Sequence, residues 1–88
     1  MKYHITLLIE LKDGILDPQG RAVEGVLQGL EYPVENVRVG RVLEMEIGAQ
    51  SEAEARAAAH NIGKALSNPV MEVFVVEAVK ELVWKELV

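Results

Sequence analysis

The side chains able to carry out acid–base or nucleophilic chemistry are few in this 88-residue chain, and their spacing favours no reaction. His4 and His60 fall on a predicted strand and a predicted helix, without a neighbouring carboxylate or cysteine at metal-ligand spacing. Ser51 and Ser67 lie at predicted helix ends, and neither belongs to the nucleophile motif of a serine hydrolase. We therefore interpret both histidines as surface or interface residues rather than catalytic or metal-binding ones.

Three acidic residues are the remaining candidates for binding a cation or a basic partner. Glu44 and Glu46 share one face of a predicted strand, and Glu10 could join them in an acidic patch. A solvated sheet face explains the same pattern, and we favour it because water screens exposed charges. An enzyme that uses Glu44, Glu46 or His4 on its own is the weakest of the functions considered.

A second polar group lies at the start of the first predicted helix. Asp17 and Pro18 are typical of a helix N-terminus, since Asp caps free amide groups and Pro tolerates the first helical position. This start does not require Gln19 or Arg21, which could hold an anion or a partner carboxylate beside the free N–H groups of the first turn. A plain solvent-exposed helix start explains them equally well.

The overall composition excludes several classes of protein. A net charge of -5, a pI of about 4.9 and scattered basic residues argue against nucleic-acid binding. The chain has no cysteine, which rules out disulfides and thiolate zinc sites and fits a reducing compartment. It shows no signal-peptide pattern and no apolar run of membrane-spanning length. We expect a cytoplasmic protein that binds neither nucleic acid nor membrane.

The hydrophobic periodicity predicts a single α+β domain over residues 1–88 with the order β-α-β-β-α-β. Strands are expected over residues 2–12, 37–39, 42–47 and 70–79, with a hairpin turn at Gly40-Arg41, and helices over residues 17–30 and 51–67. The second helix begins with a capping box at Ser51–Glu54. This order is that of a ferredoxin-like antiparallel sheet with two helices on one face and the last strand at an edge beside the first.

Apolar residues at helical spacing predict the side of each helix that packs on the sheet. In the first helix they are Ala22 or Val23, Val26, Leu27 and Leu30. In the second they are Ala55, Ala58, Ala59, Ile62 and Leu66.

The last strand is apolar on both faces, with Met71, Val73, Val75 and Val79 on one and Phe74, Val76 and Ala78 on the other. The tail Leu82–Val88 is apolar as well, and we interpret it as a docked segment. Because the apolar surface of the last strand and the tail exceeds what two helices can cover, we expect self-association.

The segments Leu11–Val23, Val37–Arg41 and Leu43–Ile47 together resemble the PurS family, the small subunits of phosphoribosylformylglycinamidine synthase. The resemblance implies a role in purine biosynthesis. In the form of this enzyme made of separate proteins, a glutaminase releases ammonia, and a large synthetase subunit uses ATP and Mg to form the amidine. The PurS-like subunit joins them, has no catalytic residues and no cofactor of its own, and forms dimers.

On this basis we expect two interfaces. Contacts with the synthetase and glutaminase subunits are expected from Asp17, Gln19, Arg21, Arg38 and Arg41. The homodimer contacts are expected from Val73, Val75, Val79, Leu82 and Trp84, and the choice between dimer and tetramer stays open. The alternative is a free-standing ferredoxin-like regulatory module that binds a ligand at its dimer interface.

Overall fold

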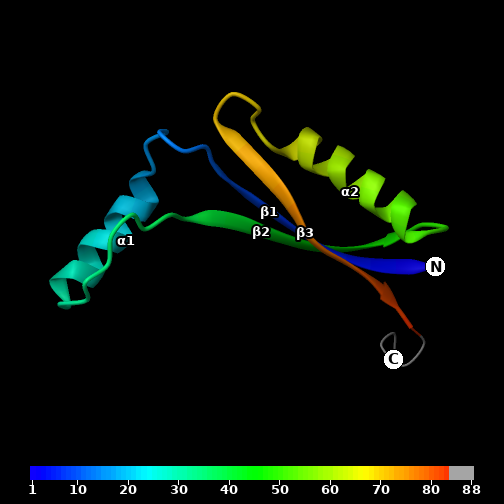
Figure 1. The fold of residues 1–88 in the computed structure, drawn as a ribbon, viewed down its shortest axis with the longest axis horizontal. Coiled ribbons are helices and arrows are strands. Elements are labelled where there is room, and N and C mark those ends of the chain that lie inside the picture. The colour runs from blue at the N-terminus through cyan, green and yellow to red at the C-terminus, as the bar shows by residue number, and fades with distance from the viewer. Residues whose placement is uncertain (84–88) are drawn as a thin grey trace.

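The computed structural model describes residues 1–83 as a three-stranded sheet with two helices (Figure 1). The elements in chain order are β1 (Lys2–Leu11), α1 (Pro18–Gly29), β2 (Gly40–Gly48), α2 (Glu52–Leu66) and β3 (Glu72–Leu82). The predicted α+β class is confirmed, with the order β-α-β-α-β.

The sheet is antiparallel and has the strand order β2-β1-β3. The predicted place of the last strand, at an edge beside the first, is therefore confirmed. Tyr3, Ile5, Leu7 and Ile9 alternate along β1 and are at most 3% exposed, as the period of two in the sequence predicts. Their side of the sheet forms the core.

The predicted hairpin at Gly40-Arg41 is wrong, and so is the fourth strand over residues 37–39. Gly40 and Arg41 belong to β2 and pair with Glu10 and Ile9 of β1. The N–H groups of Val37 and Val39 donate to side-chain oxygens of Glu24 and Asp17, at 3.0 and 2.9 Å. Because these acceptors replace a neighbouring strand, the segment runs beside α1 instead of joining the sheet.

Helix α2 covers one face of the sheet and packs across β1 and β3 (Figure 1). It begins as predicted, since the N–H of Glu54 donates to the Ser51 hydroxyl at 3.1 Å. Ala55 and Ala59 are buried as predicted, whereas Leu66 is 48% exposed, against prediction. Gly63, absent from the predicted stripe, is also buried, and brings the helix against the ring of Phe74.

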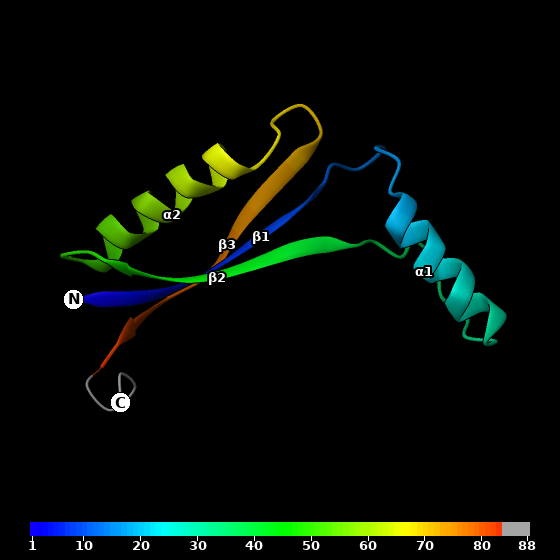
Figure 2. The same cartoon turned by 180° about the vertical axis from the view of Figure 1, so that it is seen from behind.

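The prediction that both helices lie on one face of the sheet is wrong for α1. This helix extends beyond the end of the sheet, well away from α2, as both views show (Figures 1 and 2). Its apolar stripe contacts no strand extensively, and Val23, Val26 and Leu30 are 42%, 63% and 64% exposed. The reason is local: the first turns of α1 bond to residues 37–39 and not to the sheet.

A β-bulge in β3 changes the predicted faces of that strand. The register shifts between Thr6 and Leu7 of β1, so that Glu77 has no partner in the ladder. Beyond this point Ala78 joins the face of Val73 and Val75, while Val79 moves to the face covered by α2. The sequence-based grouping of Val79 with Val73 and Val75 is therefore wrong.

None of the helices in residues 1–83 is both long and apolar enough to cross a membrane.

The close contact between α2 and β3 predicts the effect of adding one methyl group. A Cβ on Gly63 would lie 2.6 Å from Cε2 of Phe74, whereas a Cβ on Gly25 would meet no atom within 4 Å. We expect Gly63→Ala to lower the free energy of unfolding by about 1–3 kcal/mol through overpacking. Gly25→Ala should be neutral or stabilising, because alanine favours helix. Urea denaturation at one fixed chain concentration measures both, and equal stability of the two variants would contradict the packing.

Candidate functional site at the junction of β1 and α1

The carboxylate of Asp17 lies at the centre of the junction between the first strand and the first helix. It is the N-cap of α1, and its Oδ1 accepts from the N–H of Gly20 at 2.8 Å. Its Oδ2 accepts from the N–H of Val39 at 2.9 Å, and the residue is only 8% exposed. One side chain thus connects the start of the helix to the segment that leads into β2.

Gly20 allows this close approach. A Cβ at this position would lie 2.7 Å from Oδ2 of Asp17 and still closer to the carbonyl oxygen of Val37. Any larger residue would push the helix away from the segment of residues 37–39. The Leu-Asp-Pro-Gln-Gly part of the sequence therefore has a structural reason for its glycine.

Arg38 ties the junction to the end of β1. Its Nη2 donates to the carbonyl oxygens of Leu11 and Lys12, at 2.6 and 3.2 Å. Its Nη1 lies 3.5 Å from Oδ1 of Asp13, and its Nε lies 3.7 Å from Oδ2 of Asp17. Arg38 is thus largely occupied by groups of its own chain.

The hydrogen bonds at Asp17 also set its charge state. Donation from the N–H groups of Val39 and Gly20 lowers the pKa of Asp17, and the Arg38 guanidinium lowers it further. Partial burial acts in the opposite direction and is outweighed. The carboxylate is therefore ionised at neutral pH.

Arg41 is likewise paired inside the chain. Its Nη2 lies 3.2 Å from Oε2 and 3.4 Å from Oε1 of Glu72. This ion pair joins β2 to β3 across the end of β1. The same Glu72 accepts from the N–H of Asn68 at 2.8 Å. Arg41 therefore fixes the position of the turn between α2 and β3.

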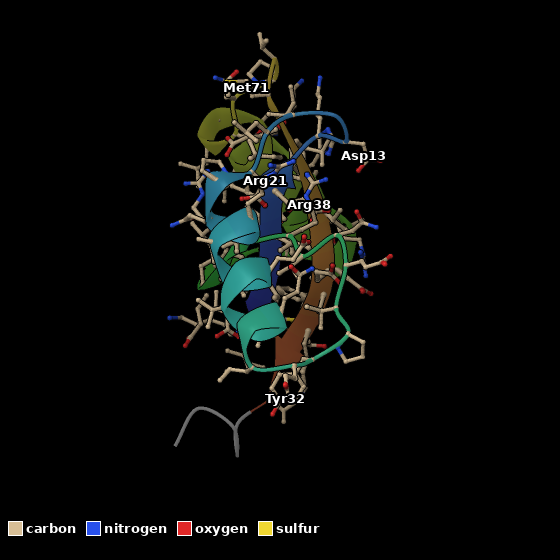
Figure 3. The ribbon with its side chains drawn as sticks, turned by 90° about the vertical axis from the view of Figure 1, so that its left-hand side faces the viewer. Asp13, Arg21, Tyr32, Arg38 and Met71 are labelled. Atoms are coloured by element: carbon tan, nitrogen blue, oxygen red, sulfur yellow. The ribbon has the colours of Figure 1, made fainter. Side chains whose placement is uncertain are left out.

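Gln19 and Arg21 differ from the other three predicted partner residues. Both are exposed, and within residues 1–83 the side chain of neither makes a hydrogen bond or an ion pair. Arg21 lines an open hollow of about 390 Å³ with Asp17 and Arg38. Figure 3 shows Arg21 and Arg38 near each other at the start of α1. Gln19 lines a second hollow of about 320 Å³ that Arg41 and Glu72 also border.

Other titratable groups form pairs on the sheet surface. Nε2 of His4 lies 3.2 Å from Oε1 of Glu44, and Nζ of Lys2 lies 3.8 Å from Oε1 of Glu46. These exposed pairs agree with a solvated sheet face. In the part of the chain that the structure describes, no three His, Cys, Asp or Glu side chains gather in a way that could hold a metal ion.

The predicted homodimer residues fall into different places. Val73 and Val75 are 39% and 44% exposed on the sheet face that α2 leaves open. Val79 packs against the core cluster beneath α2. Leu82 is half-buried at the end of β3, and Trp84 lies outside the described residues.

Sequence reasoning missed two features of this site. A carboxylate oxygen of Glu24 accepts from the N–H of Val37, and the guanidinium of Arg38 donates to the carbonyl oxygen of Leu11 at the end of β1. Nothing in the sequence spacing could assign these acceptors, because the partners are 13 and 27 residues apart. The glycine three residues after the cap was the one available signal for a close approach at Asp17.

The chain is a small α+β protein with a polar strand-to-helix junction. Its three antiparallel strands have the order β2-β1-β3, and one helix covers the sheet while the other projects from it. The family model PurS, described as phosphoribosylformylglycinamidine (FGAM) synthase, matches residues 4–80. The chain therefore belongs to the PurS family, and the resemblance carried by the segments Leu11–Val23, Val37–Arg41 and Leu43–Ile47 is confirmed.

Three relatives illustrate the similarity. PurS of Thermus thermophilus has 60% identity and a TM-score of 0.90, over 94% of this chain and 100% of that one. A chain in the structure of PurLQS from Thermotoga maritima has 25% identity and a TM-score of 0.78, over 93% and 99%. The Synechocystis PurS subunit of phosphoribosylformylglycinamidine synthase is 41% identical over 54 residues, 60% of this chain. That match spans 54% of the Synechocystis subunit, about half its length.

The lowered pKa of Asp17 predicts a pH-dependent contribution to stability. Because the pKa is lower in the folded state, the contribution is complete above the unfolded value of about 4 and is lost as pH falls through the folded value. Asp17→Asn should therefore destabilise the chain at pH 7, and its difference from wild type should shrink toward pH 3. Denaturant unfolding across this range measures it. Asp13→Asn, at a fully exposed side chain, is the control, and an equal effect of both variants would contradict the assignment.

Proposed function

We propose that this chain is a non-catalytic subunit of phosphoribosylformylglycinamidine synthase that joins the glutaminase to the ATP-dependent synthetase in purine biosynthesis. Its membership of the PurS family supports this, as does its similarity to a chain of the Thermotoga maritima PurLQS structure. The large subunit would use ATP and Mg to convert formylglycinamide ribonucleotide and ammonia to the amidine. The glutaminase would supply that ammonia from glutamine.

The observation that carries the proposal is that the five predicted partner residues fall into two groups, those bonded within the chain and those that remain exposed. Asp17, Arg38 and Arg41 are occupied by groups of their own chain, so they hold the junction in shape. Gln19 and Arg21 remain exposed at a helix start that those bonds hold in place. We expect these two side chains to contact a larger subunit, and the other three to position them.

A fixed junction suits the physical task of the complex. Ammonia must pass from one active site to another without loss to bulk water, which requires subunits that are sealed against each other in one arrangement. Recognition side chains on a flexible loop would lose entropy on binding, whereas side chains on a capped helix lose less. The subunit would act in this way as a homodimer that uses Val73 and Val75 of the open sheet face.

The proposal predicts a selective defect when the two free side chains are removed. The double variant Gln19→Ala/Arg21→Ala should lower glutamine-dependent turnover of the reconstituted complex by about tenfold, as expected for loss of contact residues at an interface. Turnover with added ammonium salt should stay near the wild-type rate, because the synthetase then needs no ammonia from the glutaminase. Steady-state assays with each nitrogen source measure both rates.

The control is Arg56→Ala, which removes an exposed arginine of α2 whose partner is Glu52 of the same helix. It should leave both rates unchanged. Equal loss of glutamine- and ammonium-dependent turnover in the Gln19/Arg21 variant would count against the proposed contact, and so would an unchanged glutamine-dependent rate.

A further inference from the structure

The loop between β1 and α1 places an exposed aspartate directly before a glycine, at Asp13-Gly14. The side chain of Asp13 is fully exposed and lies at the outside of its loop (Figure 3). The N–H of Gly14 donates to no group within residues 1–83. A carboxyl group and the unbonded amide nitrogen of the next residue, both open to water, are the two reactants of succinimide formation.

The backbone of this loop leaves room for such a ring to close. Gly14 has a φ of +84°, which glycine adopts without steric cost, and a Cβ at this position would meet no atom within 4 Å. The turn is closed by one hydrogen bond, from the N–H of Ile15 to the carbonyl oxygen of Lys12 at 3.2 Å. Because a single exposed hydrogen bond adds little stability, the turn can rearrange as the ring forms.

The sequence confines this reaction to one aspartate. Asp13 and Asp17 are the only two in the chain. Asp17 precedes Pro18, whose nitrogen lacks the hydrogen that ring closure would displace. Its carboxylate is also only 8% exposed and accepts from the N–H groups of Gly20 and Val39. The two aspartates therefore differ in each property that the reaction requires.

We propose that Asp13 isomerises to isoaspartate through a succinimide while the chain is folded. The nitrogen of Gly14 loses its proton and bonds to Cγ of Asp13, and a carboxyl oxygen leaves as water. Water then opens the ring on one of two sides. Cleavage between the nitrogen and Cγ restores aspartate. Cleavage between the nitrogen and the main-chain carbonyl carbon of Asp13 gives isoaspartate, with the peptide link through Cβ and Cγ and a free α-carboxylate. One water is released and one is taken up, so the mass of the chain is unchanged.

Isoaspartate at this position alters the loop more than the strand before it. The main chain gains one carbon atom between Lys12 and Gly14, so the hydrogen bond from Ile15 to Lys12 cannot keep its present geometry. The carboxylate whose Oδ1 lies 3.5 Å from Nη1 of Arg38 becomes part of the peptide link. The end of β1 keeps the donation of Arg38 to the carbonyl oxygen of Leu11. The inference concerns this chain alone and does not depend on the proposed contacts with the glutaminase and synthetase.

Incubation of the folded chain at mildly alkaline pH tests the proposal. After incubation and unfolding, a protein L-isoaspartate methyltransferase with radiolabelled S-adenosylmethionine marks each free α-carboxylate of isoaspartate. The label should rise with incubation time in wild type. Asp13→Glu, which keeps the charge, is the matched variant and should lose this rise, because glutamate would have to close a larger ring that forms far more slowly.

Peptide mapping locates the modified residue. Cleavage after glutamate releases the peptide Leu11–Glu24, which should appear as two species of equal mass after incubation. Only one of them should be cut before residue 13 by a protease specific for aspartate. A single species that is cut completely, from a chain that has taken up label, would overturn the assignment to Asp13.

A parallel incubation in guanidinium chloride separates the folded loop from the sequence alone. Folded and unfolded chains should both accumulate isoaspartate, since the fold leaves both reacting groups open. Label that appears only in the unfolded chain would overturn the proposal, and so would an equal rise in Asp13→Glu. Label that maps to an asparagine such as Asn36, with the mass gain of deamidation, would overturn it as well.

Discussion

The arrangement of this chain depends on the carboxylate of Asp17. It caps α1, accepts the N–H of Val39 before β2 and lies beside Arg38, which in turn holds the end of β1. Three parts of the chain therefore meet at one ionised group. Polar contacts at this point, and not apolar packing along the helix, determine the direction in which α1 leaves the sheet.

These polar contacts have different consequences for the first turn of α1 and for the rest of the helix. At its start, the internal bonds leave Gln19 and Arg21 exposed on a supported turn, which suits recognition of another protein. Along its length, the same bonds keep the apolar stripe away from its own sheet. A single polar junction thus explains both the exposure of the proposed contact residues and the position of the apolar stripe away from its own sheet.

Much of the fold was predictable because it follows from local patterns. The alternation from Tyr3 to Ile9 identified the buried side of β1, and the caps at Asp17 and Ser51 identified both helix starts. The hairpin was not predictable in the same way, because alternating residues 37–39 satisfy their N–H groups with side chains distant in sequence. The bulge at Glu77 also lacked a local signal, since a run of valines fits either face.

The candidate site shows the same limit. Sequence spacing located Asp17, Gln19 and Arg21, but it could not separate residues that hold the junction from residues that remain free. The inward contacts of Arg38 depend on carbonyl groups at the end of β1, which have no side-chain signature. The apolar residues at helical spacing in α1, Val23, Val26, Leu27 and Leu30, likewise predict a covered side of the helix without indicating what covers it.

The central claim is that the chain acts by joining other proteins and not by chemistry of its own. Sedimentation velocity of the purified glutaminase and synthetase, with glutamine and ADP present, tests this most directly. We expect the glutaminase and the synthetase to sediment separately until this chain is added, and to sediment together with it afterwards. Association of the large subunits to the same extent without the chain, or a chain that sediments alone in the full mixture, would contradict it.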